Sequence, residues 1–188
     1  MTDVLLIIDV QNAILDGAAH DDRIETVKTY FNAVVGRLSD LKESAASQNV
    51  PTILVQNDGP DGHRLAVGSK GWEIVPDLTP TPSDIVVHKV SCDSFHETDL
   101  MEHLTRIGAS RLIVGGCMTQ FCVDTTVRRA VSSGFDVVLI SDGHCTGDSR
   151  TLTQSEIIAH HNNTLDGFDA GQCVVSVVPA AAVSFRVS

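Results

Sequence analysis

The feature that most constrains the fold is a series of short, continuous apolar runs, each about long enough for one strand. Residues 4–8 form the first run, and comparable runs recur at 52–56, 84–89, 111–115, 135–141 and 173–178. Helical patterns separate them at 22–47, 98–107, 119–133 and 153–165. Strands without alternating polar residues are buried on both faces, as in parallel sheets. The sequence therefore predicts an α/β fold, a doubly wound (Rossmann-like) three-layer sandwich with a mainly parallel six-stranded sheet.

Length and charge narrow the class further. The 188 residues fit one domain spanning 1–188. A formal net charge of −11 opposes binding to nucleic acid and to anionic membranes. No apolar run approaches the roughly 20 residues of a membrane span, and the first residues lack the pattern of a signal peptide. Five scattered cysteines, an odd number, favour a reducing compartment, so we expect a cytoplasmic protein.

Three residues of different chemistry fall at or just beyond the predicted strands. A parallel doubly wound sheet binds its ligand at the carboxyl ends of its strands, and there the sequence places Asp9, Lys89 and Cys122. Cys122 falls in the first turn of a predicted helix, where the helix dipole and a nearby ammonium would lower the thiol pKa. Taken singly, each residue has a simpler explanation: Asp9 could cap the end of a strand, Lys89 could be solvated, and Cys122 could pack within its helix. Their joint placement predicts a catalytic centre.

Common cofactor motifs are missing. The first strand is followed by Asp-Val-Gln-Asn instead of the glycine-rich dinucleotide fingerprint, and residues 62–70 lack the spacing of a P-loop. Asp61 and His63 lie in the Gly-rich segment 57–83, a long loop that is a candidate lid, and we expect both side chains to be solvated. We therefore predict neither a cofactor nor a catalytic metal.

Several blocks resemble the isochorismatase-like cysteine hydrolases, and the resemblance covers nearly the whole chain. The matching blocks are residues 5–12, 88–100, 138–142 and 157–162, together with the most specific one, Val114-Gly115-Gly116-Cys117-Met118-Thr119-Gln120-Phe121-Cys122-Val123-Asp124-Thr125-Thr126.

The resemblance implies a mechanism. Cys122 would attack a carboxamide carbonyl to form a thioester, Asp9 would shuttle protons, and Lys89 would balance their charges. It also implies a cis peptide bond between Cys117 and Met118, with the backbone amides of Met118 and Cys122 as the oxyanion hole. The substrate would be a small molecule, and the protein a homo-oligomer, either a dimer or a tetramer.

Two other functions stay open. One is a vinyl-ether hydrolase like isochorismatase itself, which keeps the aspartate but does not require a nucleophilic cysteine. The other is a non-enzymatic interaction module that merely retains the fold.

Candidates for substrate binding are Gln11, Trp72 and Phe95. The two aromatic side chains could stack on a planar substrate or instead plug a loop or a subunit interface. Gln11 could bind a substrate amide or order its own loop. His144 is expected in a loop, with no assigned role, and Asp142 as a strand-end cap.

Overall fold

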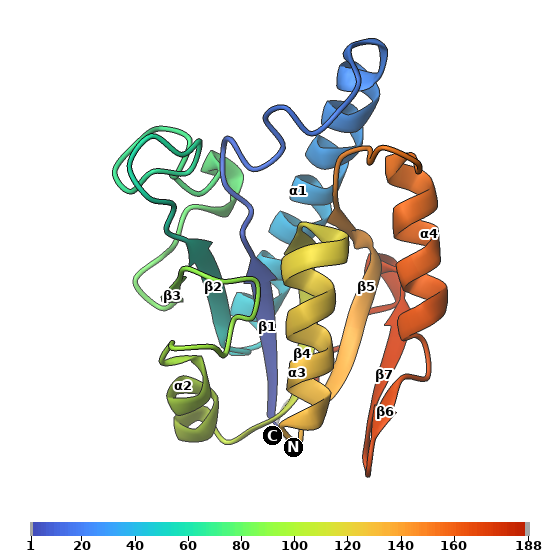
Figure 1. Cartoon of the computed structure of the whole chain (residues 1–188). Helices are drawn as coiled ribbons and strands as arrows, with labels where there is room; N and C mark the ends of the chain where they lie inside the picture. The colour runs from blue at the N-terminus through green and yellow to red at the C-terminus, as the bar shows by residue number, and fades with distance from the viewer. Residues whose placement is uncertain (1, 187–188) are drawn as a thin grey trace.

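The computed structural model describes residues 2–186 and shows one twisted sheet between layers of helices (Figure 1). Its strands are ordered β3-β2-β1-β4-β5-β7-β6, and each neighbouring pair is parallel except β6 with β7. Their bounds are β1 Thr2–Ile8, β2 Thr52–Asn57, β3 Ile85–Lys89, β4 Ala109–Cys117, β5 Asp136–Cys145, β6 Asp169–Ala170 and β7 Cys173–Val178. The predicted doubly wound α/β fold is confirmed.

The helices cover both faces of the sheet (Figure 1), and strands β1, β2 and β4 are buried on both faces along most of their length. The four helices described are α1 Ile24–Ser47, α2 Leu100–Ile107, α3 Asp124–Ser132 and α4 Gln154–Leu165. Side chains alternate along β1, so Leu5 and Ile7 pack with α1, whereas Leu6 and Ile8 pack with α2 and α3 on the opposite face. No helix within the described residues combines the length and the hydropathy of a transmembrane span.

The prediction of six strands was wrong by one. β6 has two residues and pairs only with β7, so it is too short to leave an apolar run in the sequence. β5 also continues beyond its predicted end at residue 141 to Cys145, after a register shift in its pairing with β4. His144 therefore lies in a strand, opposite Gly116, and not in a loop as predicted.

The long segment between β2 and β3 packs against the rest of the domain. It contains one 3-10 turn, η2 (Pro76–Leu78), and it buries Leu65 and Leu78. A bridge between Gln11 and Ile74 ties it to the residues that follow β1. These contacts place one side of the segment against the carboxyl end of the sheet.

The strand order reverses between β1 and β4. The chain moves outward from β1 through β2 to β3, then returns to add β4 on the other side of β1. Loops that leave adjacent strands in opposite directions open a crevice at this point. Asp9 follows β1, and Met118 follows β4, so both border that crevice.

Gly116 allows β1 and β4 to approach closely beside the crevice. Its φ is +123°, a backbone conformation that residues with a side chain rarely adopt. A Cβ there would lie 2.1 Å from the carbonyl oxygen of Ile8. The atoms that a Cβ at Gly116 would contact belong to the backbone of β1, which cannot move away as the end of a flexible side chain could.

We therefore expect Gly116→Ala to lower the free energy of unfolding by at least about 2 kcal/mol. Gly36→Ala is the control, because Gly36 lies inside α1 with open space around it. That change should raise stability by about 0.5–1 kcal/mol through helix propensity. Urea unfolding of both variants measures the two effects, and a Gly116→Ala protein as stable as wild type contradicts this account of the strand contact.

Candidate active site

Asp9 is the first residue after β1 and turns out of the sheet into the crevice. Its φ of 51° lies in the left-handed region, which Asp adopts more readily than most residues. Its backbone amide still donates to the carbonyl of Val55 on β2, at 2.9 Å. The Asp9 side chain is fully buried, so the carboxylate is held away from bulk water.

Lys89, the last residue of β3, has a buried ammonium group with three acceptors. Its Nζ donates to Asp9 Oδ2 at 2.6 Å, to the carbonyl oxygen of Ser91 at 2.8 Å and to Cys122 Sγ at 3.3 Å. An ammonium has three N–H bonds, so this set uses all of them. Lys89 thereby links the carboxylate to the thiol.

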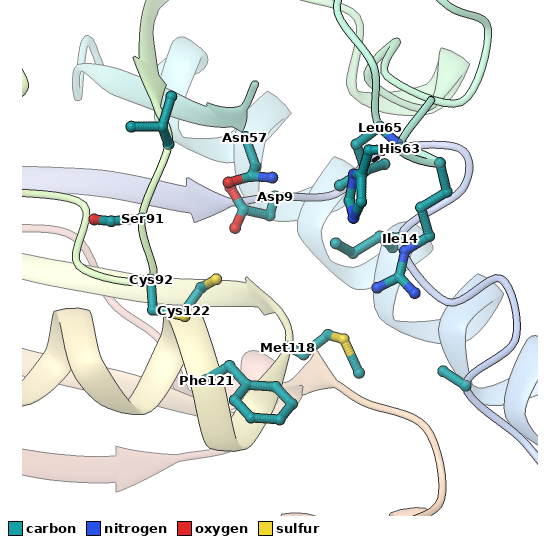
Figure 2. A pocket seen from close by; sticks show the side chains of 13 residues that line it. Asp9, Ile14, Asn57, His63, Leu65, Ser91, Cys92, Met118, Phe121 and Cys122 are labelled. Atoms are coloured by element: carbon teal, nitrogen blue, oxygen red, sulfur yellow. Dashed lines mark hydrogen bonds between the residues drawn. The ribbon is translucent and has the colours of Figure 1, made fainter. Parts of the chain in front are cut away.

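Cys122 lies in η3 (Thr119–Val123), a π-helical turn that precedes α3. The peptide bond between Cys117 and Met118, which leads into this turn, is cis, and that prediction is confirmed. Figure 2 shows Cys122 and Asp9 bordering one cavity, with Met118 and Phe121 along its lower side in this view. The structure thus brings together the three residues predicted to form the catalytic centre.

One oxygen of the Asp9 carboxylate has no hydrogen-bond partner among the described residues. Asp9 Oδ1 is buried, whereas Oδ2 is occupied by Lys89. Buried carboxylate oxygens without a partner are costly, since they lose their hydration without replacement. Because Asp9 lines the cavity, Oδ1 is the atom of this pair that is available to accept a proton.

Burial and charge set the protonation of this cluster. Burial raises the pKa of Asp9, although the neighbouring Lys89 and Cys122 oppose that shift. Burial alone would lower the pKa of Lys89, but the charges and hydrogen bonds of Asp9 and Cys122 together outweigh burial, and the pKa is raised. Lys89 therefore remains an ammonium at neutral pH.

The expectation of a lowered pKa at Cys122 was wrong. Burial raises the pKa of this thiol, and the Asp9 charge raises it further, while Lys89 acts in the opposite direction. The residue also lies in a π turn ahead of α3, and not in the first turn of a regular α-helix. Cys122 is consequently a neutral thiol at neutral pH, and it needs a base in order to act as a nucleophile.

The cavity beside this cluster has a volume of about 460 Å³, which suits a small molecule. Asp9, Cys122 and Asn57 contribute a carboxylate, a thiol and an amide to its lining. Much of the remaining wall is apolar and includes Ile14, Leu65, Val90, Met118 and Phe121.

Gln11 does not line the cavity. Its side-chain amide nitrogen donates to the carbonyls of Asn57 and Trp72, and its carbonyl oxygen accepts from the Asn57 amide. The side chain is fully buried. Of the two roles left open for Gln11, this geometry matches the ordering of loops.

Trp72 and Phe95, both predicted to border the substrate, also lie outside the cavity lining. The Trp72 indole donates to Asp58 Oδ1 at 2.7 Å and stacks on His88, with ring centroids 5.9 Å apart. Phe95 stacks on Phe135 at 6.3 Å and packs against the core on the α3 face. Both rings therefore pack against other parts of the protein. Phe121, which the sequence analysis did not select as a candidate, lines the cavity instead.

Asp58, His88 and His63 have partners within the protein. Asp58 Oδ1 also lies 3.0 Å from His88 Nδ1, and His63 Nδ1 accepts from the Leu65 amide at 3.1 Å. Within residues 2–186 no group of three or more His, Cys, Asp or Glu side chains is arranged to hold a metal ion. The absence of a catalytic metal stays a prediction.

The sequence did not predict the burial of His144. Its ring is fully buried behind the Cys122 turn and contacts Thr119 Oγ1 and Asn162 Oδ1, each at 2.9 Å. Asp142, predicted as a strand-end cap, accepts from the Ala180 amide and pairs with Arg37. The burial of His144 could not be read from the sequence, because the apolar run ends at residue 141 whereas β5 continues to Cys145.

The fold and the site together define a doubly wound α/β protein with a buried carboxylate–ammonium–thiol cluster at the point where its strand order reverses. Comparison with known proteins agrees with this class. The family model for the isochorismatase domain matches residues 3–163, so the chain belongs to the isochorismatase family.

Two relatives and one solved structure illustrate the similarity. A streptothricin hydrolase of Streptomyces noursei is 35% identical over 144 residues, a match that covers 77% of this chain and 50% of that protein. A ureidoacrylate amidohydrolase of Methylobacterium radiotolerans is 26% identical, with 96% of this chain and 83% of that protein covered. The crystal structure of an isochorismatase from Pseudomonas putida is 26% identical with a TM-score of 0.84, covering 97% and 90% of the two chains. The chain spans about half the length of the streptothricin hydrolase it matches.

The raised pKa of Cys122 makes a testable prediction about alkylation. Replacing Asp9 by Asn removes the negative charge that disfavours the thiolate and leaves Lys89 in place, so the thiol pKa should fall. Iodoacetamide should then label Cys122 several times faster at pH 7 in Asp9→Asn than in wild type. Peptide mass spectrometry separates this label from that on exposed Cys92.

Asp40→Asn, an exposed change on α1, serves as the control and should not alter the rate. Unchanged or slower labelling of Cys122 in Asp9→Asn contradicts the proposed electrostatics.

The burial of His144 makes stability depend on pH. Burial lowers its pKa from the ordinary 6.5 to about 4, although the hydrogen bond with Asn162 opposes the shift. Between these values the unfolded chain binds a proton that the folded chain does not, so stability falls as pH drops from 6.5 to about 4. This one group should cost about 3 kcal/mol over that window. Urea unfolding should show a shallower pH dependence in His144→Gln, and equal slopes in both proteins would exclude a buried neutral imidazole.

Proposed function

We propose that this chain is a cysteine-dependent hydrolase that cleaves the C–N bond of a small amide through a thioester on Cys122. The observation that carries the proposal is the arrangement of Asp9, Lys89 and Cys122 at the cavity, with Asp9 Oδ1 left without a partner. The family assignment and the amidohydrolase among the relatives support it.

In the first step the thiol must lose its proton, because a neutral thiol is a poor nucleophile. Asp9 Oδ1 accepts that proton as Cys122 Sγ attacks the substrate carbonyl carbon. The raised pKa of Asp9 suits a base that later returns its proton. Lys89 stays protonated throughout and compensates whichever of its two neighbours carries the negative charge.

The second step breaks the C–N bond. The carbonyl oxygen becomes an oxyanion, and we assign its stabilisation to the backbone N–H groups of Met118 and Cys122. When the tetrahedral intermediate collapses, Asp9 passes its proton to the leaving nitrogen, and ammonia or an amine departs. The acyl group remains on Cys122 as a thioester.

Hydrolysis of the thioester completes the cycle. Asp9 takes a proton from a water molecule, which attacks the thioester carbonyl; the acid is released, and the proton returns to Cys122. Every proton transfer uses Asp9, and the chain of steps requires no redox group. The substrate is a small molecule of a size that the cavity of about 460 Å³ holds, and a homo-oligomer is the expected assembly.

A panel of primary amides, ureido acids and lactams tests the proposal through the release of ammonia, amine or a newly ionised carboxylate. For any substrate that wild type hydrolyses, Cys122→Ala should abolish turnover while the far-UV spectrum stays unchanged. Residual activity above a few per cent would exclude a nucleophilic role for Cys122 and favour direct attack by water, as in a vinyl-ether hydrolase.

Asp9→Asn tests the proton-transfer role separately. The change keeps the side-chain volume but removes the base, so kcat should fall by about 10²–10⁴-fold. Asp40→Asn again serves as the matched control. Near-normal turnover in Asp9→Asn would assign proton transfer to another group.

A further inference from the structure

A buried chain of hydrogen bonds runs behind the turn that carries Cys122. His144 Nδ1 lies 2.9 Å from Thr119 Oγ1, and His144 Nε2 lies 2.9 Å from Asn162 Oδ1. Asn162 Nδ2 in turn donates to the carbonyl of Ser141 at 3.0 Å. Neither His144 nor Thr119 lines the cavity, and both are almost completely buried.

The end of this chain fixes the proton on the imidazole. A backbone carbonyl only accepts, so the Asn162 group facing Ser141 is the NH₂, and the group facing His144 is the carbonyl oxygen. His144 Nε2 must therefore carry a hydrogen and donate it. In the neutral ring Nδ1 is then an acceptor, and the Thr119 hydroxyl donates to it.

The ring is neutral at physiological pH. Burial lowers the pKa of His144 to about 4, and nearby His161 acts in the same direction. The hydrogen bond with Asn162 and the charge of Asp142 act in the opposite direction without overcoming burial.

These hydrogen bonds connect three elements, η3, β5 and α4, next to the turn that carries Cys122. Thr119 follows Met118 and begins η3, of which Cys122 is the fourth residue. His144 belongs to β5 and pairs with Gly116 of β4, and Asn162 belongs to α4. The imidazole therefore connects the start of the Cys122 turn to two elements that do not touch the substrate cavity.

We infer that His144, as the neutral Nε2–H tautomer, is a positioning residue that holds Thr119 and thereby directs the Cys122 sulfur and the Met118 and Cys122 amides toward the reacting carbonyl. This inference rests on the proposed function of Cys122. Misplacement of a reacting group by about 1 Å can cost on the order of 10²-fold in rate. Loss of this contact consequently affects the chemical step more than it affects substrate binding.

Thr119→Val tests the contact with little change in volume, since it removes only the hydroxyl. We expect kcat to fall about 10–100-fold with KM within about threefold of wild type. Thr119→Ser restores the hydroxyl and should recover most of the loss. His144→Leu should lower kcat to a similar extent, and the double variant should be no slower than the slower single variant, because both changes break one connection.

Arg111→Met controls for destabilisation alone. Arg111 forms a buried ion pair with Asp3, at 2.9 Å from Nε to Oδ1, near the starts of β4 and β1 and thus at the opposite end of the sheet. Its loss should lower stability at least as much as Thr119→Val does, yet leave kcat within about twofold. Wild-type kcat in Thr119→Val, a multiplicative double variant or an equal loss of kcat in Arg111→Met would each overturn the inference.

Two measurements on His144 and Cys122 do not depend on amide hydrolysis. Nitrogen-15 NMR of the histidine rings at pH 7 should show His144 protonated at Nε2 and bare at Nδ1; the other tautomer or a cationic ring overturns the inference even if no variant folds. The alkylation rate of Cys122 at fixed pH should differ between wild type and Thr119→Val by more than about threefold, and equal rates count against the inference. If both results are obtained but the wild-type protein cleaves no amide, the proposed function is refuted and the positioning of the Cys122 turn stands.

Discussion

The contact between Lys89 and Asp9 is the interaction on which the site depends. Both side chains are fully buried, and the distance between Nζ and Oδ2 is 2.6 Å. A lone buried charge costs several kcal/mol, so each group requires the other. The ammonium uses its remaining donors on Ser91 and Cys122, which fixes the thiol beside the unpartnered oxygen of the carboxylate. Burial raises the pKa of Asp9 and of the Cys122 thiol, and the Asp9 charge helps to keep Lys89 protonated between them.

The sheet brings these groups together from distant parts of the sequence. Asp9 and Lys89 are 80 residues apart, yet each lies at the carboxyl end of its strand on the same edge of the sheet. Cys122 reaches them from the turn η3 that follows β4, and β4 neighbours β1 because the strand order reverses there. The absence of a side chain at Gly116 allows β4 to lie against Ile8, directly before Asp9. The fold and the site therefore share their most constrained contact.

Sequence patterns predicted those parts of the molecule that depend on burial over several residues. Continuous apolar runs identified six of the seven strands described, and the strand-end positions of Asp9 and Lys89 followed from them. The two-residue strand β6 left no such signal. Trp72 and Phe95 were misplaced because their partners, Asp58 and Phe135, are chosen by tertiary contacts that no local pattern encodes. The thiol pKa of Cys122 could not be predicted either, because it depends first on the burial of the thiol itself and then on the charge of Asp9, and both are set by tertiary contacts.

The central claim is that Cys122 becomes acylated during turnover, and rapid acid quench tests it most directly. A substrate with a heavy-isotope label in its acyl group is mixed with the protein, quenched within one turnover, and digested for mass spectrometry. The account predicts a transient acyl group on the peptide that contains Cys122, labile to hydroxylamine as a thioester is, and its accumulation when water attack is slowed in deuterium oxide. Turnover of the substrate with no acylated Cys122 peptide at any quench time, or with the label on another residue, would contradict it.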